Sequence, residues 1–226
     1  MLTTIGHRGA MGYAPENTLV SFHKAIELGV DMIELDVHVC KSGELVVIHD
    51  ETVDRTTDGH GDVAEMILQE LQKLDAGKGE CIPTLSEVLD FADRKVRVNI
   101  ELKGKQTAKP TCKVIEKYIM QRNWMCDDFL VSSFVYDELK VFRALNPKIA
   151  LGILITEQEF NYVEITKELG AGAVIPEYHL VSEQYVNDAH ERGLQIVVWT
   201  VNEKNDIERM KQIGVDGIIS NYPDRV

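Results

Sequence analysis

Acidic side chains alternate with apolar residues in a segment near the N-terminus. The polar positions of the run 32–39 are two residues apart: Glu34, Asp36 and His38. In an extended chain, such residues point to the same face. The run 96–102 repeats the pattern with Asn99 and Glu101, and Lys103 follows it. Because burying an ionised carboxylate without a partner is prohibitive, these carboxylates must be paired or bind a metal.

The carboxylates predict a metal site of a particular kind. Glu34, Asp36 and Glu101 would supply oxygen ligands, with no thiolate or group of histidines beside them. Such a set suits one divalent cation, Ca²⁺ or Mg²⁺ with Mn²⁺ as a further candidate, better than Zn²⁺. His38 is interpreted as a non-ligand residue that lines or rims the site, since imidazole matches a Ca²⁺-type site poorly. The alternative is an ion network in which basic side chains neutralise the acids without a metal.

Two histidines stand at the ends of extended runs. His7 follows the first apolar run of the chain, and His49 ends another. An imidazole near neutrality can donate or accept a proton, so the pair could serve as acid and base in catalysis. Arg8 and Lys103 add positive charge in the same places, and an arginine can grip a phosphate through two N–H groups.

An acidic composition narrows the classes of partner. Lys and Arg number 24 against 37 Asp and Glu, so the formal net charge of the 226 residues is −13. We expect no nucleic-acid partner and no membrane partner, because such a surface repels duplex phosphate and anionic lipid. Three carboxylates, one divalent cation, Arg8 and Lys103 together leave a single positive charge. A phosphodiester monoanion would neutralise it.

The cysteines and the N-terminal segment indicate the cellular compartment of the protein. Four cysteines, at positions 40, 81, 112 and 126, match neither a metal knuckle nor a compact disulfide framework, so we interpret them as reduced thiols. The chain starts without a basic region followed by an apolar stretch, and no apolar run reaches about 18 residues. We therefore expect a cytoplasmic protein. The sequence leaves its oligomeric state open, with a homodimer among the alternatives.

Strand-like and helix-like segments alternate along the chain. Eight short apolar runs recur: 2–6, 32–39, 96–102, 129–133, 149–155, 173–176, 195–201 and 216–220. Segments with helical spacing lie between most of them, such as 17–28 and 203–213, which predicts a parallel sheet. Eight strand–helix units in one chain of this length predict a small α/β fold, a (β/α)₈ TIM barrel. The competing architecture is an open doubly wound sheet, but the first turn lacks its glycine-rich phosphate motif.

One interval is too long for a single strand–helix unit. The second run begins near residue 32 and the third near 96, with an extra extended run at 45–49 that predicts a hairpin. Helical stretches are expected near 64–74 and 84–93. We interpret 51–83 as an insertion that caps the active site of a single 1–226 domain, since barrel sites are built from the loops at the carboxyl ends of the strands.

Nine short motifs occur along the chain: His7-Arg8-Gly9, Pro15-Glu16-Asn17-Thr18, Glu34-Leu35-Asp36-Val37, His49-Asp50, Arg55-Thr56-Thr57, Glu101-Leu102-Lys103, Ser132-Ser133-Phe134, Trp199-Thr200-Val201-Asn202 and Asp216-Gly217-Ile218-Ile219-Ser220-Asn221-Tyr222-Pro223. Each alone is a weak signal. In this order, with an insertion between the second and third strands, they resemble the glycerophosphodiester phosphodiesterase family over essentially the whole chain. The short insertion points to a small headgroup over a bulky lipid.

The resemblance implies a metal-dependent hydrolysis of glycerophosphodiesters to sn-glycerol 3-phosphate and an alcohol. It implies these roles: metal ligands Glu34, Asp36 and Glu101; the acid–base pair His7 and His49; phosphate binding by Arg8 and Lys103; and an aromatic wall beside the glycerol from Phe134 and Trp199. Two alternatives stay open. One is a phosphodiesterase of lysophospholipids on the same barrel, and the other is a non-catalytic barrel that binds glycerophosphodiesters.

Overall fold

A closed barrel of parallel strands forms the centre of the computed structural model, which describes residues 2–157 and 162–226. Its strands are β1 (Thr3–Gly6), β2 (Met32–Val39), β4 (Arg97–Leu102), β5 (Phe129–Ser133), β6 (Ala150–Ile155), β7 (Ala173–Pro176), β8 (Gln195–Val198) and β9 (Gly217–Ser220). Each pairs in parallel with its neighbours, and the β1–β2 pairing closes the ring. The prediction of a TIM barrel is confirmed.

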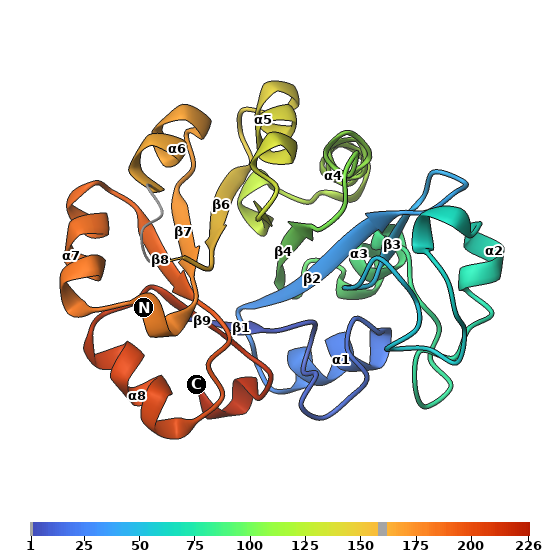
Figure 1. Ribbon diagram of the computed structural model, residues 1–226, viewed down its shortest axis with the longest axis horizontal. Coiled ribbons are helices and arrows are strands. Elements are labelled where there is room, and N and C mark those ends of the chain that lie inside the picture. Colours follow the sequence, from blue (N-terminus) through green and yellow to red (C-terminus); the bar gives the residue numbers. More distant parts are fainter. Residues whose placement is uncertain (1, 158–161) are drawn as a thin grey trace.

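Helices surround the barrel, as Figure 1 shows. They are α1 (Leu19–Glu27), α3 (Leu85–Ala92), α4 (Ala108–Arg122), α5 (Tyr136–Leu145), α6 (Tyr162–Leu169), α7 (Glu183–Glu191) and α8 (Lys204–Gln212). The apolar side chains of these helices and the outward-facing side chains of the strands share one large core. Burial of that continuous apolar surface is the main force that holds the helices against the barrel.

Local signals set the bounds of the elements. Thr18 accepts a hydrogen bond from the backbone of Ser21 and so caps the start of α1. At the other ends of helices, Gly170, Gly193 and Gly214 adopt the positive φ that favours glycine. The predicted strand 195–201 is shorter in the structure, because Trp199 leaves the sheet after a single bridge to Glu177.

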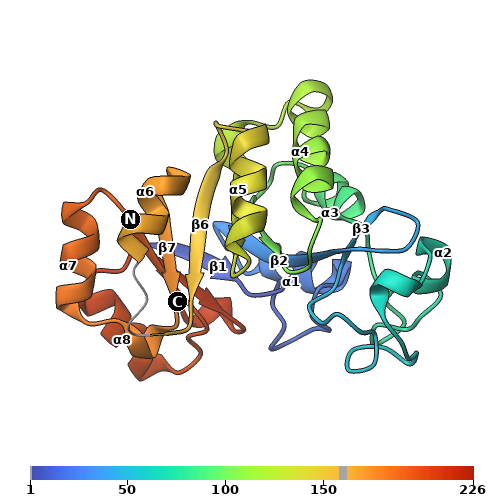
Figure 2. The same ribbon diagram turned by 45° about the horizontal axis from the view of Figure 1, so that its top comes forward.

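The long interval contains a strand that lies outside the barrel. β3 (Leu45–Val47) pairs antiparallel with the end of β2, which confirms the predicted hairpin. After it come the short helix α2 (Leu68–Leu71) and a second hydrophobic cluster that includes Val53, Val63 and Leu71. Figures 1 and 2 both show α2 at the periphery, on the side of the barrel that carries β3.

The prediction of one helix near 64–74 is wrong. A 3₁₀ turn (Val63–Glu65) and α2 take its place, with Met66 and Ile67 extended between them. The reason is a tertiary contact, because the carbonyl of Met66 accepts a hydrogen bond of 2.9 Å from the backbone of Lys41 in the hairpin turn.

The turn after β1 depends on Gly9. Its φ is +85°, and a Cβ there would lie 2.4 Å from Ser21 Oγ and 2.5 Å from the Ser21 carbonyl carbon. We expect Gly9→Ala to lower the free energy of unfolding by at least ~2 kcal/mol, because it adds overpacking to backbone strain. Gly193→Ala is the matched control, since its φ is +74° with nothing within 4 Å of the added carbon.

Urea denaturation of both variants measures the difference. Gly193→Ala carries only the backbone strain of about 1 kcal/mol. Equal decreases in the free energy of unfolding of the two variants would contradict the predicted clash at Gly9.

Two further findings concern the sequence expectations. Within residues 2–157 and 162–226, no helix combines the length and the apolar character needed to cross a membrane. All four cysteines are free thiols, as predicted.

Candidate active site

Polar side chains converge where the barrel strands end. A cavity of about 140 Å³ opens there. Its lining comes from residues on seven barrel strands or just after them, and from His49, which follows β3: His7, Arg8, Glu34, His49, Asn99, Glu101, Lys103, Ser132, Phe134, Leu154, Trp199, Thr200 and Ile219. Eight of the nine site residues expected from the sequence are in this lining, and the ninth, Asp36, belongs to the acidic cluster beside it.

The acidic cluster consists of Glu34, Asp36 and Glu101. One carboxylate oxygen of each lies within 4.8 Å of the others, and all three residues are buried. Register explains the meeting, because Asp36 on β2 is directly opposite Glu101 on β4, and Glu34 is two residues earlier on the same face. Burial and then repulsion within the cluster raise the pKa of Glu34 and of Glu101 above the usual carboxyl value.

The cluster fits a divalent cation. Asp36 Oδ2 lies 2.8 Å from Asn17 Nδ2 and 3.3 Å from Arg8 Nε, whereas Asp36 Oδ1 is buried with no hydrogen-bond donor among the described residues. A buried carboxylate oxygen without a donor is costly unless a ligand satisfies it. Three carboxylates around one point supply the oxygen ligands that Mg²⁺, Ca²⁺ and Mn²⁺ prefer.

We expect cation binding to release protons near neutral pH. The raised pKa values of Glu34 and Glu101 mean that the cation-free cluster retains protons that a cation must displace. The affinity for Mg²⁺, Ca²⁺ or Mn²⁺ should therefore fall as the pH is lowered from 8 to 6. Calorimetric titration in two buffers of different ionisation enthalpy measures the protons released. A pH-independent affinity with no proton release would contradict this cluster as the binding site.

Each histidine of the site is held through Nδ1. His7 Nδ1 lies 2.6 Å from Asn221 Oδ1, and His49 Nδ1 lies 2.5 Å from Asp50 Oδ1. An amide oxygen and an ionised carboxylate only accept hydrogen bonds, so both Nδ1 atoms donate. This leaves Nε2 of each ring to exchange a proton with a ligand. Burial and then the Arg8 guanidinium lower the pKa of His7 to about 4, so His7 is neutral at pH 7.

Arg8 and Lys103 bring positive charge to the cavity. Arg8 pairs with Glu16 at 2.7 Å and with Asp36 at 3.3 Å, while its backbone N–H donates to Glu34 at 2.9 Å. Lys103 Nζ lies 3.0 Å from Glu101 Oε1. Each side chain carries more donors than these contacts use, since a guanidinium has five N–H groups and an ammonium three. The remaining donors can bind the oxygens of an anionic ligand.

An apolar wall closes another side of the cavity. Phe134 and Trp199 meet edge to face with ring centroids 5.5 Å apart. The indole Nε1 donates to the carbonyl of Ile175 at 2.9 Å, which fixes the orientation of the ring. Lys103 Nζ lies 5.6 Å from the centroid of Phe134. The wall can therefore pack against a small carbon skeleton next to the charged groups.

The interpretation of His38 as a non-ligand agrees with the structure, but its predicted place in the lining does not. It belongs neither to the acidic cluster nor to the cavity lining. Its Nε2 lies 3.0 Å from the carbonyl oxygen of His49, and its ring packs so close to Gly104 that an added Cβ would be 2.8 Å from Nδ1. His38 therefore supports the backbone behind His49.

Four supporting residues had no role assigned from the sequence: Glu16, Asn17, Asp50 and Asn221. All lie in the motifs of the sequence analysis, yet none alternates with apolar residues in a way that marks a site. Their partners are up to 214 positions away, as for Asn221 with His7. Such pairs follow from the closing of the barrel and have no local signal.

Comparisons with known proteins agree on one family. The profile described as "Glycerophosphoryl diester phosphodiesterase family" matches residues 7–225. A glycerophosphodiester phosphodiesterase of Caldanaerobacter subterraneus is 38% identical, with 97% of this chain and 94% of the relative covered. A human lysophospholipase D is 25% identical, with 98% and 84% covered.

Solved structures are similar over the whole fold. An Oleispira antarctica phosphodiesterase in complex with the product sn-glycerol-3-phosphate superposes with a TM-score of 0.91 at 32% identity, covering 98% of this chain and 93% of that one. A glycerophosphodiester phosphodiesterase from Agrobacterium tumefaciens gives a TM-score of 0.86 at 28% identity, with 100% and 98% covered.

Proposed function

The chain belongs to the glycerophosphoryl diester phosphodiesterase family, and we propose that it uses His7 and His49 as acid and base with one divalent cation held by Glu34, Asp36 and Glu101. It is a hydrolase that converts glycerophosphodiesters to sn-glycerol 3-phosphate and an alcohol. One observation supports these proposed roles: an acidic cluster, two histidines and two cationic side chains meet at one cavity.

The histidines take different roles in this proposal. His7 is neutral at pH 7 because burial and Arg8 lower its pKa to about 4, so it accepts the proton of the nucleophile. His49 has the ionised Asp50 carboxylate against Nδ1, so a positive charge on its ring is compensated when it holds the proton for the leaving alkoxide. Each side chain thus makes one proton transfer: His7 gains the proton that the nucleophile loses, and His49 gives its proton to the leaving alkoxide.

Arg8 and Lys103 hold the phosphate. Their free donors face a monoanionic diester and stabilise the charge that grows on its oxygens during reaction. Glu34, Asp36 and Glu101 would hold the cation, which would supply Lewis-acid polarisation of a phosphate oxygen. Phe134 and Trp199 pack against the glycerol carbons and orient the diester bond between the two histidines.

The short insertion after β3 favours small diesters. The cavity of about 140 Å³ has room for a glycerol phosphate group, which small diesters and lysophospholipids share. Glycerophosphocholine and glycerophosphoethanolamine are therefore the proposed substrates on the length of the insertion, and a lysophospholipid is the alternative. We assign residues 51–83 to a capping insertion of a single domain, and the four free thiols support a cytoplasmic location for the enzyme.

The test is hydrolysis of glycerophosphocholine, glycerophosphoethanolamine and lysophosphatidylcholine, followed as release of choline or ethanolamine. The other product is sn-glycerol 3-phosphate from the first two substrates and lysophosphatidic acid from the third. Each is assayed with chelator and then with Mg²⁺, Ca²⁺ or Mn²⁺ restored. We expect cation-dependent release from the small diesters. Preference for the lysophospholipid would instead favour the activity named for the human relative. No turnover by a folded sample with any cation would overturn the proposal and favour a binding protein.

A further inference from the structure

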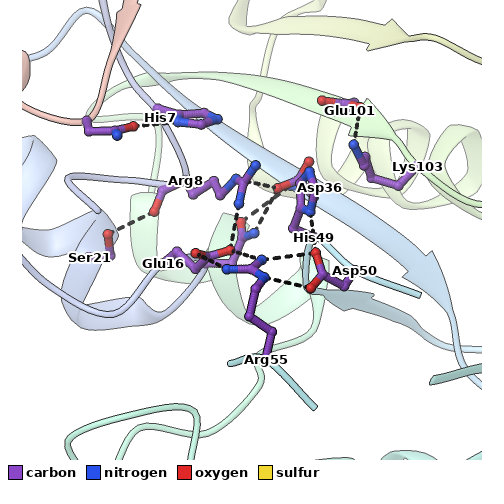
Figure 3. A network of polar contacts seen from close by, with 12 residues as sticks. His7, Arg8, Glu16, Ser21, Asp36, His49, Asp50, Arg55, Glu101 and Lys103 are labelled. Atoms are coloured by element: carbon purple, nitrogen blue, oxygen red, sulfur yellow. Dashed lines mark hydrogen bonds and ion pairs between the residues drawn. The ribbon is translucent and has the colours of Figure 1, made fainter. Parts of the chain in front are cut away.

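Arg55 contacts two carboxylates of the site from the loop that follows β3. Its guanidinium donates four hydrogen bonds: Nε to Asp50 Oδ2 at 2.7 Å, Nη2 to Asp50 Oδ1 at 3.0 Å, Nη2 to Glu16 Oε1 at 2.8 Å and Nη1 to Glu16 Oε2 at 2.8 Å. Both carboxylates are thus bound through two oxygens. Figure 3 shows the guanidinium between them. Such paired hydrogen bonds fix geometry as well as charge.

Each carboxylate also holds one residue of the proposed machinery. Glu16 Oε1 accepts from Arg8 Nη1 at 2.7 Å as well as from Arg55. Asp50 Oδ1 faces His49 Nδ1 at 2.5 Å as well as Arg55. One guanidinium therefore connects the phosphate-binding arginine to the proton-transferring histidine, although the first lies in the turn after β1 and the second in the segment after β3.

We propose that Arg55 is a positioning residue that sets Arg8 and His49 relative to each other through Glu16 and Asp50. This rests on the roles proposed above for Arg8 and His49. Arg55 itself does not line the cavity, so it acts through its two carboxylate partners. The loop after β3 thereby supplies part of the reaction geometry in addition to any cover over the site.

Charge explains why the network needs a cation at this point. Hydrogen bonds from Arg55 lower the pKa of Asp50, and those from Arg55 and Arg8 lower the pKa of Glu16 to about 2 against the effect of burial. Both are therefore anions that bind the same guanidinium. Without it they would repel each other, and each would draw its remaining partner, Arg8 or His49, out of place.

A simpler role for Arg55 would be to anchor the loop after β3 to the barrel, and the structure argues against it. The segment after β3 has its own buried cluster, which includes Val53, Val63 and Leu71, and β3 is hydrogen-bonded to β2. The side chain of Arg55 is 48% exposed, and ion pairs with that exposure contribute about 0–1 kcal/mol to stability. Loss of Arg55 should therefore leave the fold intact.

The experiment compares Arg55→Ala and Arg55→Lys with Arg192→Ala. Arg192 makes the same two-oxygen pair with Asp188 at similar exposure, but at the C-terminal end of the outer helix α7. We expect kcat/KM for glycerophosphocholine to fall about 10–100-fold in both Arg55 variants, through higher KM and lower kcat together, since small displacements of reacting groups cost that much. Arg55→Lys should not restore the rate, because an ammonium lacks the fork that binds two carboxylates. Arg192→Ala should be unchanged.

Two further readouts separate positioning from a structural role. Methylguanidinium at tens of millimolar should recover part of the activity of Arg55→Ala, while methylammonium should not. In NMR spectra, the Nδ1 proton of His49 should shift or broaden in Arg55→Ala and stay unchanged in Arg192→Ala. The melting temperature should change little in any variant.

The outcomes are distinct. Wild-type kcat and KM in Arg55→Ala with an unchanged His49 signal would overturn the proposal, as would full activity in Arg55→Lys. If the wild-type protein hydrolyses no diester, the proposed function fails. The His49 signal still tests the coupling in that case, and an unchanged signal in Arg55→Ala would overturn it.

Discussion

His49→Ala is expected to lower kcat by about 10²- to 10⁴-fold, the usual contribution of one general acid–base step. His49 lines the cavity and is held by the ionised Asp50, so its removal takes away the proposed proton donor while the proposed phosphate-binding groups remain. KM should change far less than kcat. Steady-state kinetics with glycerophosphocholine measure both values, and a thermal melt confirms that the variant is folded.

A substrate with a different leaving group distinguishes the proposed roles of the two histidines. A p-nitrophenyl ester of glycerol phosphate releases a weakly basic anion that needs no proton, so His49→Ala should recover most of its rate on that substrate. His7→Ala should not, because it lacks the proton acceptor. His23→Ala is the control, since His23 is exposed on α1. Near-normal turnover of glycerophosphocholine by His49→Ala would remove His49 from the mechanism.

Glu34→Gln is expected to abolish activity and yet stabilise the cation-free protein. Loss of a ligand should reduce kcat/KM about 10³-fold or more, because Lewis-acid stabilisation amounts to several kcal/mol. The pKa of Glu34 is raised in the fold, chiefly by burial and then by Asp36 and Glu101. The folded protein therefore binds a proton at this site more tightly than the unfolded chain, and ionisation of Glu34 lowers stability as the pH rises.

Glutamine removes that cost and still accepts the backbone N–H of Arg8 through its amide oxygen. We expect a gain of at least ~1 kcal/mol at pH 8, or about 2–4 °C in melting temperature, and a smaller gain at pH 5. Added Mg²⁺ or Ca²⁺ should raise the melting temperature of the wild type more than that of the variant. A variant that is less stable at pH 8 than the wild type without cation would contradict the repulsion within the cluster.

Much of the fold follows from local sequence patterns. The eight parallel strands were predictable because each is a short apolar run, and because Gly170, Gly193 and Gly214 end helices where a positive φ is needed. Period-two alternation also placed Glu34 and Asp36 on one face, and their meeting with Glu101 needed only the neighbouring strand. The element types therefore follow from local sequence, and the acidic cluster follows once β2 and β4 are taken as neighbours.

The supporting contacts could not be predicted in this way. Arg55 and Glu16 are 39 positions apart and belong to irregular segments, so no periodicity relates them. The helix expected at 64–74 failed for a similar reason, since the hairpin turn at Lys41 competes for the carbonyl of Met66. Helical spacing predicts which face of a helix is apolar. It does not predict which backbone groups will form hydrogen bonds with a distant loop.

The two halves of β2 serve different neighbours. Met32 and Ile33 pair with β1 and close the barrel, whereas residues 37–39 pair with β3. The other edge of β2 is paired with β4 throughout residues 32–37. The hairpin is thus attached beyond the point of closure, and its length is free of the barrel's register. Insertions in the turn at residues 41–44 could therefore accumulate in descendants of this chain without shifting the register of the barrel strands. Exchange of β3 itself is constrained, because Leu45 and Val47 pack in the main core.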